Sequence, residues 1–228
     1  MFEQFAPFRG EHAGESAILF ATGSSVNQFS YNLLPESPDV RVGVNRIICR
    51  DDISLDYYFC AHYHDNDHPR DPSFLDKIVS RSKDLQVFCA SMFNGASFSE
   101  FFSPAQALQM GAIAYELHSR TGVDAFCTDL VREPMYNHSI VFPALQFMLY
   151  TGVRRIYLVG CDCGGPHSCV EGQFESFSND YNGHTCLVPN WKEFAEFKDQ
   201  VYPEVEIISI NPRGLKEMFI DYNAQEQT

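Results

Sequence analysis

The sequence is poor in positive charge. Its 228 residues include 16 Lys and Arg against 30 Asp and Glu, which gives a formal net charge of -14. Clustered Lys and Arg supply most of the non-specific affinity of proteins for nucleic acids, so this balance predicts that the chain does not bind nucleic acid. A small ligand in a local pocket remains compatible with the charge.

Long apolar runs are absent too. No stretch approaches the roughly 20 apolar residues that a membrane-spanning helix needs, and the opening residues, MFEQFAPFRGEHAGE, have neither the basic start nor the apolar core of a secretory signal. A hydrophobic content of 45% and a charged content of 20% exclude a disordered chain. We therefore expect a globular, cytoplasmic protein without a transmembrane segment.

The chain shows no internal repeat and no linker, and its length fits one α/β domain. Residues 1–16 are expected to be an extension that Phe2, Phe5 and Phe8 anchor to a domain over residues 17–228. Of the eight cysteines, four lie in or beside short apolar runs, where free cysteine behaves as a small buried hydrophobe. These four are expected to be reduced core residues: Cys49, Cys60, Cys89 and Cys127.

The domain is organised around a helix and a strand in residues 139–162. Four apolar side chains share one helical face, and Gly152 follows where helices commonly take a left-handed last residue. Residues 156–159 are continuously apolar, which is typical of a parallel strand covered on both faces. The loop after such a strand lies at the carboxyl edge of the sheet, where open α/β folds bind ligands. The four helical residues are Phe142, Leu145, Met148 and Leu149.

Similar patterns predict the other elements. Further strands are expected over residues 17–21, 40–44, 57–61, 86–90, 125–128 and 205–210, and helices over residues 72–82, from Ser103 to about Arg120, from a capping box at Asn190, and after Asn211–Pro212. Residues 164–190 lack periodicity and are expected to form a lid. This order predicts a single Rossmann-like α/β domain, with a mostly parallel sheet, helices on both faces and a lid loop.

Polar residues at two expected strand ends are candidates for binding a nucleotide. Gly23, Ser24 and Ser25 form a short turn after the first strand, ahead of an expected helix whose N-terminal N–H groups would attract phosphate. Asn45 ends the second strand, where its amide is placed to read a ribose or base edge or, alternatively, to form a turn. After the third strand, residues 62–68 read HYHDNDH; a solvated loop that touches substrate is favoured there over a metal site.

Five short motifs occur in a recognisable order: ATGSSV after the first strand, VNR at the end of the second, GVRRIYLVGCD in the centre, NGHT in the lid and EVEIISINPRGL near the end. With this order and spacing, the chain after residue 16 resembles the bacterial sialyltransferases of glycosyltransferase family 42 and the related 6-hydroxymethylpterin diphosphokinase-like family. The resemblance implies a Rossmann-like domain with a lid that transfers sialic acid from CMP-sialic acid to a glycan or small-molecule acceptor. It implies no cofactor and no divalent metal in the chemical step.

The resemblance also implies roles for single residues. His184, in the Gly-His pair of the lid, would be the general base, which suits an imidazole with a pKa near 6.5. Gly23, Ser25 and Asn45 would hold the nucleotide. The whole set expected to bind the nucleotide is Gly23, Ser24, Ser25, Asn45, Ser139, Asp162 and Gly164.

The chain departs from the family pattern beyond the central strand. Where the family has two tyrosines that stabilise the departing phosphate, this sequence has Gly164 and Val170 or their neighbours. Developing negative charge needs donors, which Tyr181, His167 or N–H groups of the loop would have to supply. Another nucleotide sugar, or pyrophosphoryl transfer, therefore stays open.

Two alternatives remain. A diphosphokinase-like enzyme would use ATP and Mg²⁺, with Asp162 as a metal ligand. In a transferase, or in a purely structural role, the same carboxylate would accept backbone N–H bonds and hold the loop, which is the commoner role of an aspartate at a strand end. A non-catalytic binding protein would instead be held by zinc, for which thiolate and imidazole are the preferred ligands. Its candidate ligands are Cys161, Cys163, His167, Cys169, His184 and Cys186. The oligomeric state is open, with a homo-oligomer among the alternatives.

Overall fold

The computed structural model describes residues 2–60, 72–97, 104–136, 138–163 and 187–222. The strands are β1 Ser16–Phe20, β2 Val40–Val44, β3 Tyr57–Cys60, β4 Gln86–Phe93, β5 Ala96–Ser97, β6 Ile113–His118, β7 Met135–Tyr136, β8 Arg155–Val159, β9 Glu206–Ile210 and β10 Ile220–Tyr222. The α-helices are α1 Pro72–Arg81, α2 Pro104–Gln109, α3 Val141–Thr151 and α4 Leu187–Val201. Short 3-10 helices are η1 Glu3–Phe8, η2 Ser24–Gln28, η3 Tyr31–Leu33, η4 Asn45–Cys49 and η5 Val123–Ala125.

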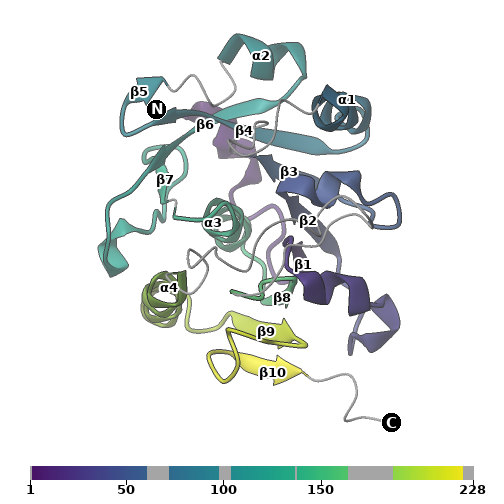
Figure 1. Ribbon diagram of the computed structural model, residues 1–228. Coiled ribbons are helices and arrows are strands. Elements are labelled where there is room, and N and C mark those ends of the chain that lie inside the picture. Colours follow the sequence, from purple (N-terminus) through teal and green to yellow (C-terminus); the bar gives the residue numbers. More distant parts are fainter. Residues whose placement is uncertain (1, 61–71, 98–103, 137, 164–186, 223–228) are drawn as a thin grey trace.

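The strands form one ten-stranded sheet in the order β10-β9-β8-β1-β2-β3-β4-β6-β7, with β5 paired to β4 (Figure 1). The β4–β5 pair is antiparallel, and the pairs along the main path are parallel. The predicted fold class, a single Rossmann-like α/β domain with a mostly parallel sheet, is confirmed. None of the helices in the described ranges combines the length and the apolar character that crossing a bilayer requires.

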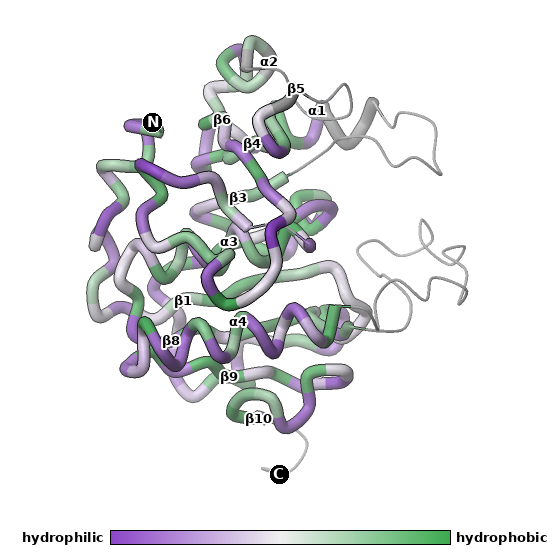
Figure 2. The backbone as a smooth tube through the Cα atoms, turned by 90° about the vertical axis from the view of Figure 1, so that its left-hand side faces the viewer, coloured by the Kyte–Doolittle hydropathy of each residue, from purple (hydrophilic) through white to green (hydrophobic). Residues whose placement is uncertain are grey.

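Helices cover both faces of the sheet, and alternation along the strands sorts the core into two clusters. On β1, Ala17 and Leu19 belong to the cluster that contains the buried residues of α3 and α4, whereas Ile18 and Phe20 belong to the cluster under η2, η4 and α1. Burial of apolar surface on both sides, at about 25 cal/mol per Å², stabilises this three-layer arrangement. In Figure 2, α4 changes between hydrophilic and hydrophobic residues along its length, as expected for a helix with one face on the core.

The organising helix and strand are confirmed. Every residue of α3 is buried, and Gly152 ends the helix with φ 86 in the left-handed region. The strand β8 comes directly afterwards, and its Ile156–Val159 segment is buried. Because α3 lies between the sheet and the packing supplied by the N-terminal segment and α4, it is buried all round rather than on one stripe only, and its polar residues Gln146 and Thr151 are buried and hydrogen-bonded.

Two predictions for the middle of the chain are wrong. The helix expected up to Arg120 ends at Gln109, because Gly111 turns with φ 66 and the next residues pair with β4 as the parallel strand β6. The strand expected over residues 125–128 is absent from that described segment, where the 3-10 helix η5 ends at Ala125. The short strand β7 forms farther along, at Met135–Tyr136.

One predicted helix boundary and one predicted helix near the end of the chain are also wrong. The helix α4 begins at Leu187, so Asn190 lies inside it, and its amide donates to the Tyr136 hydroxyl at 2.6 Å instead of capping. The closing helix expected after Asn211 is replaced by turns that lead into β10. Pairing of β10 with β9, continued by the Asn211 N–H bond to the Tyr222 carbonyl, satisfies the backbone there.

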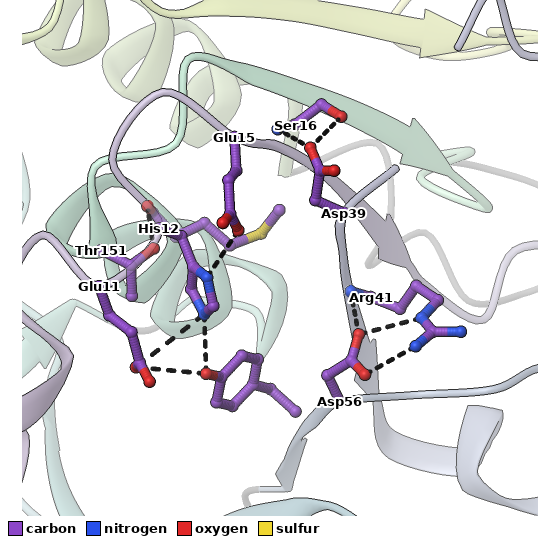
Figure 3. A network of polar contacts seen from close by, with 10 residues as sticks. Glu11, His12, Glu15, Ser16, Asp39, Arg41, Asp56 and Thr151 are labelled. Carbon is purple, nitrogen blue, oxygen red and sulfur yellow. Dashed lines mark hydrogen bonds and ion pairs between the residues drawn. The ribbon is translucent and has the colours of Figure 1, made fainter. Parts of the chain in front are cut away.

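The N-terminal segment, residues 2–15, packs against the core, and Ser16 already belongs to β1. Phe5 is buried and stacks on Phe88 with ring centroids 5.5 Å apart, while Phe2 and Phe8 pack against the same cluster. Polar contacts at the amino ends of the strands add to this anchoring (Figure 3): the His12 ring nitrogens lie 2.8 Å from Glu15 Oε2 and 2.8 Å from the Tyr57 hydroxyl.

Neighbouring strands are tied together at the same amino edge (Figure 3). The Asp39 carboxylate, just before β2, accepts hydrogen bonds from the Ser16 N–H and hydroxyl at the start of β1. The Arg41 guanidinium donates to both carboxylate oxygens of Asp56, at 3.0 and 2.8 Å. Charged groups at this edge are therefore used in contacts within the protein.

Candidate functional site

The strand order reverses next to β1. From β1 the chain builds the sheet outward through β2, β3, β4, β6 and β7, and α3 then returns it to the other side of β1, where β8, β9 and β10 are added. Open α/β sheets bind their ligands at such a switch point, outside the carboxyl ends of the strands. Phe20 of β1 pairs with Val159 of β8 and with Gly43 of β2, so these strands end at the same height.

Asp162 joins the two loops that leave the sheet at the switch point. Its side chain is buried, and its carboxylate accepts hydrogen bonds from the Ser25 N–H at 2.9 Å, from the Ser25 hydroxyl and from the Ser24 hydroxyl at 3.4 Å. Of the two roles considered for Asp162, the structure therefore shows the carboxylate that holds the loop. The predicted turn after β1 and the residue after β8 meet as a single unit, which we call the switch-point clasp (Gly23–Ser25 with Asp162).

Close backbone approach explains the glycines of this unit. The Gly23 N–H donates to the Gly160 carbonyl at 2.8 Å, and a Cβ on Gly23 would lie 2.6 Å from the Asp162 Cγ atom. A Cβ on Gly214 would lie 2.6 Å from the Asp162 carbonyl oxygen, which accepts the Gly214 N–H at 2.8 Å. Side chains at these positions would therefore separate the three loops that meet here.

The clasp changes the expectation for phosphate binding at the first turn. The turn leads into η2, a five-residue 3-10 helix, and not into the α-helix that the sequence predicts. The Ser25 N–H is already donated to a carboxylate. Because an internal anion takes this donor, the first turn does not offer the helix N-terminus that commonly binds phosphate.

One cation lies against the clasp, and the sequence pattern did not single it out. Arg213, in the connection between β9 and β10, donates from Nη1 to the Ser24 hydroxyl at 2.8 Å. The same nitrogen lies 4.0 Å from Asp162 Oδ2, and the Arg213 side chain is 43% exposed. The sequence pattern places NPRGL at the start of a helix and within one of the five family-like motifs, but gives Arg213 no role.

The other predicted nucleotide-binding residues lie at the same edge or outside the described ranges. Asn45 comes directly after β2 with φ 49, a left-handed conformation that asparagine tolerates, so it forms the turn into η4. Ser139 lies between β7 and α3, where its carbonyl accepts the Phe142 N–H. Gly164 and the expected base His184 lie outside the described residues, as does the HYHDNDH segment.

A second polar group at this edge surrounds Tyr136. Its ring lies 6.0 Å from that of His118 and 5.2 Å from that of His138, between centroids. His118 is 3% exposed, and its Nδ1 accepts the Arg120 N–H at 3.2 Å. Burial lowers the pKa of His118 to about 4, and the charges of Arg120 and His138 act in the same direction. The sequence pattern missed this group because it placed His118 in a helix.

The described part of the chain contains no group of three or more His, Cys, Asp or Glu side chains that could hold a metal ion. Burial raises the pKa of the Cys163 thiol to about 12 and that of Cys161 well above its usual value, so both favour the protonated form. The other candidate zinc ligands lie outside the described residues. Among the expected core cysteines, Cys60, Cys89 and Cys127 are free and buried, as predicted.

Comparisons with known proteins show similarity to two glycosyltransferase structures. No protein-family model and no curated protein matches the chain. The MAf glycosyltransferase from Magnetospirillum magneticum AMB-1 aligns with 98% of this chain and 38% of its own, at 9% identity and a TM-score of 0.48. A mutant of the alpha-2,3/8-sialyltransferase CstII aligns with 94% of this chain and 89% of its own, at 14% identity and a TM-score of 0.47. This chain thus spans well under half of the MAf glycosyltransferase.

Removing the Asp162 carboxylate is expected to destabilise the protein. In Asp162→Ala, the buried Ser25 N–H and hydroxyl lose their acceptor, which should lower the free energy of unfolding by about 2–4 kcal/mol. Urea denaturation measures this loss. The control, Asp199→Ala, removes an exposed carboxylate paired with Lys198 and should change stability by less than about 0.5 kcal/mol. Equal, small effects of both substitutions would show that the clasp is not a stabilising contact.

The buried His118 should make stability depend on pH. The unfolded chain takes up a proton near the ordinary pKa of 6.5, but the folded protein only near 4, so the free energy of unfolding falls as the pH drops through this window, by at most about 3 kcal/mol. In His118→Asn, whose amide oxygen can still accept the Arg120 N–H, this part of the pH dependence should disappear. His138→Asn, at an exposed position, should keep most of it, because burial and the charge of Arg120 still lower the pKa of His118. Urea denaturation between pH 4 and 6.5 tests this, and an unchanged slope in His118→Asn would contradict it.

Proposed function

We propose that this protein is a nucleotide-dependent transferase, and that the transferred group is a glycosyl group from a nucleotide sugar. One observation carries the proposal: the turn after β1 and the residue after β8 meet at the carboxyl edge of the sheet, at the point where the strand order reverses. Ligands of open α/β sheets bind at this place. The order of the sequence motifs favours glycosyl transfer over other reactions and makes CMP-sialic acid the first donor to test.

The nucleotide would lie across the carboxyl ends of β8, β1 and β2. On the β2 side, Asn45, which begins η4, would pair with a ribose or base edge, and on the α3 side Ser139, two residues before α3, would supply a hydroxyl. In the middle, the switch-point clasp forms the floor of the site, because its glycines permit the loops to approach closely. The acceptor, a glycan or small molecule, would meet the sugar above this floor.

In this reaction the acceptor oxygen attacks the anomeric carbon of the donor. The bond between that carbon and the phosphate oxygen breaks, and its electron pair stays on the departing nucleotide. The proton of the acceptor hydroxyl passes to a base, for which His184 is the candidate, and the anomeric configuration inverts. The chain's own residues must therefore bind the nucleotide, accept one proton and stabilise a departing phosphate.

The alternative that uses ATP and Mg²⁺ is less well supported. Its proposed metal ligand, Asp162, is 5% exposed, and both of its carboxylate oxygens accept hydrogen bonds from serine groups. A magnesium ion, which demands near-octahedral oxygen coordination, would have to displace these bonds. A screen of nucleotides with and without Mg²⁺ distinguishes the two reactions.

That ligand screen tests the proposed function. CMP and CMP-sialic acid are expected to raise the thermal unfolding temperature without Mg²⁺. The free energy of unfolding should increase with ligand concentration by RT ln(1 + [L]/Kd), so the unfolding temperature should rise with it. UDP-sugars and ATP, each with and without Mg²⁺, complete the panel. If ATP is the one ligand of the panel that stabilises the protein, and does so only when Mg²⁺ is present, the diphosphokinase-like alternative replaces the proposal. If no nucleotide stabilises the protein, the proposed function is overturned.

The same panel with a lid variant separates binding from catalysis. His184→Ala should bind CMP nearly as well as the unaltered protein, but its rate of transfer should fall by about 10²–10⁴-fold, as expected for loss of a general base. His138→Ala, an exposed histidine near the same edge, should keep its rate. Full turnover in the His184 variant would remove this residue from the mechanism.

A further inference from the structure

Transfer from a nucleotide leaves negative charge on a phosphate, and the protein that holds it has a formal net charge of -14. Such a protein repels anions at long range, so a local cation is needed where the phosphate lies. The clasp cannot meet this need by itself, because its own charged group, Asp162, is an acid. Among the described residues, Arg213 is a cation that lies at the switch point.

Arg213 lies there because the backbone around it is fixed against the clasp. The next residue, Gly214, donates its N–H to the Asp162 carbonyl at 2.8 Å and approaches too closely to carry a side chain. Two residues earlier, the Asn211 N–H is bonded to the Tyr222 carbonyl. The Arg213 Cα is thus held between two backbone contacts, and its side chain reaches over the end of β8 to the turn after β1.

The guanidinium is oriented but only weakly neutralised. Its Nη1 donates to the Ser24 hydroxyl at 2.8 Å, and the buried Asp162 carboxylate lies farther away, at 4.0 Å. By contrast, Arg41, Arg50 and Arg155 hold carboxylate oxygens at 2.8, 2.6 and 2.5 Å. With 43% of its side chain exposed, Arg213 keeps donors available on the solvent side of the site.

We propose that Arg213 binds the phosphate of the nucleotide at the switch point and stabilises its negative charge as the glycosyl bond breaks. An arginine fork matches phosphate oxygens in geometry and keeps its charge at any physiological pH. Ser24 and Asp162 act on it as positioning residues, since they fix one nitrogen of the fork and leave the rest for the ligand. The proposal rests on the transferase function proposed for this protein and names the residue that recognises the phosphate.

Isothermal titration of the full chain with inorganic pyrophosphate, CMP and cytidine tests this role. In Arg213→Gln, which keeps an amide for the Ser24 hydroxyl but loses the charge, affinity for pyrophosphate and for CMP should fall about tenfold or more. Affinity for cytidine, which has no phosphate, should stay within about twofold. Arg213→Lys keeps a charge without the fork and should fall between the two.

Arg154→Gln is the matched control. Arg154 is 47% exposed and precedes β8, so it lies at the opposite, amino edge of the same strand, paired with Glu36. The substitution makes the same change in net charge, and anion affinity should therefore stay within about twofold of the unaltered protein. Thermal unfolding without ligand checks that each variant is folded. If Arg213→Gln does not fold, Arg213→Lys is compared with the unaltered protein instead. Unchanged anion affinity in Arg213→Lys would then overturn the proposal.

The outcomes separate this proposal from the transferase function. Unchanged anion affinity in Arg213→Gln, an equal loss for cytidine, an equal loss in Arg154→Gln, or no binding of pyrophosphate and CMP by the unaltered protein would each overturn the role of Arg213. If CMP binds equally well with and without Arg213, the transferase function stands while this role fails. If pyrophosphate binds through Arg213 but no nucleotide does, the phosphate site stands and the transferase function fails.

Discussion

The hydrogen bonds between the Asp162 carboxylate and Ser25 are the contact on which the carboxyl edge depends. They join the loop after β8 to the turn after β1, two segments that are distant in the sequence but adjacent where the strand order reverses. A buried carboxylate is costly unless donors satisfy it, and here a backbone N–H and two hydroxyls do so. The same acid also fixes the geometry around Arg213, so the fold at this point and the proposed phosphate site share one group.

The two edges of the sheet use charge differently. At the amino edge, acidic and basic side chains pair with one another, as in the two hydrogen bonds from Arg41 to Asp56 (Figure 3). At the carboxyl edge, Arg213 is held mainly by a hydroxyl and remains partly exposed. In a protein with a formal net charge of -14, a partly exposed cation at this edge suits the anionic ligand that we propose.

Much of the fold could be predicted from the sequence, because its strongest signals are local. The continuous apolar run of β8 and the glycine after α3 predict a buried strand and a helix end, and both are present. The helix expected up to Arg120 failed because pairing of β6 with β4 outweighs the helical propensity of that segment. The sequence predicts part of the candidate site, because it points to both the turn at Gly23 and Asp162. It does not predict that the two are in direct contact, since the register between strands of a sheet cannot be inferred from one strand. Arg213 was missed for the same reason, as its significance lies in a neighbour 189 positions away, Ser24.

The claim that a nucleotide binds at the switch point is tested most directly by following backbone amide resonances during a titration with CMP. We expect saturable shifts that are largest at Gly23, Ser25, Asp162 and Gly214, which meet at the carboxyl edge. Residues of the amino edge, such as Ser16 and Asp56, should shift little. Shifts that concentrate at the amino edge, or that do not saturate, would contradict it.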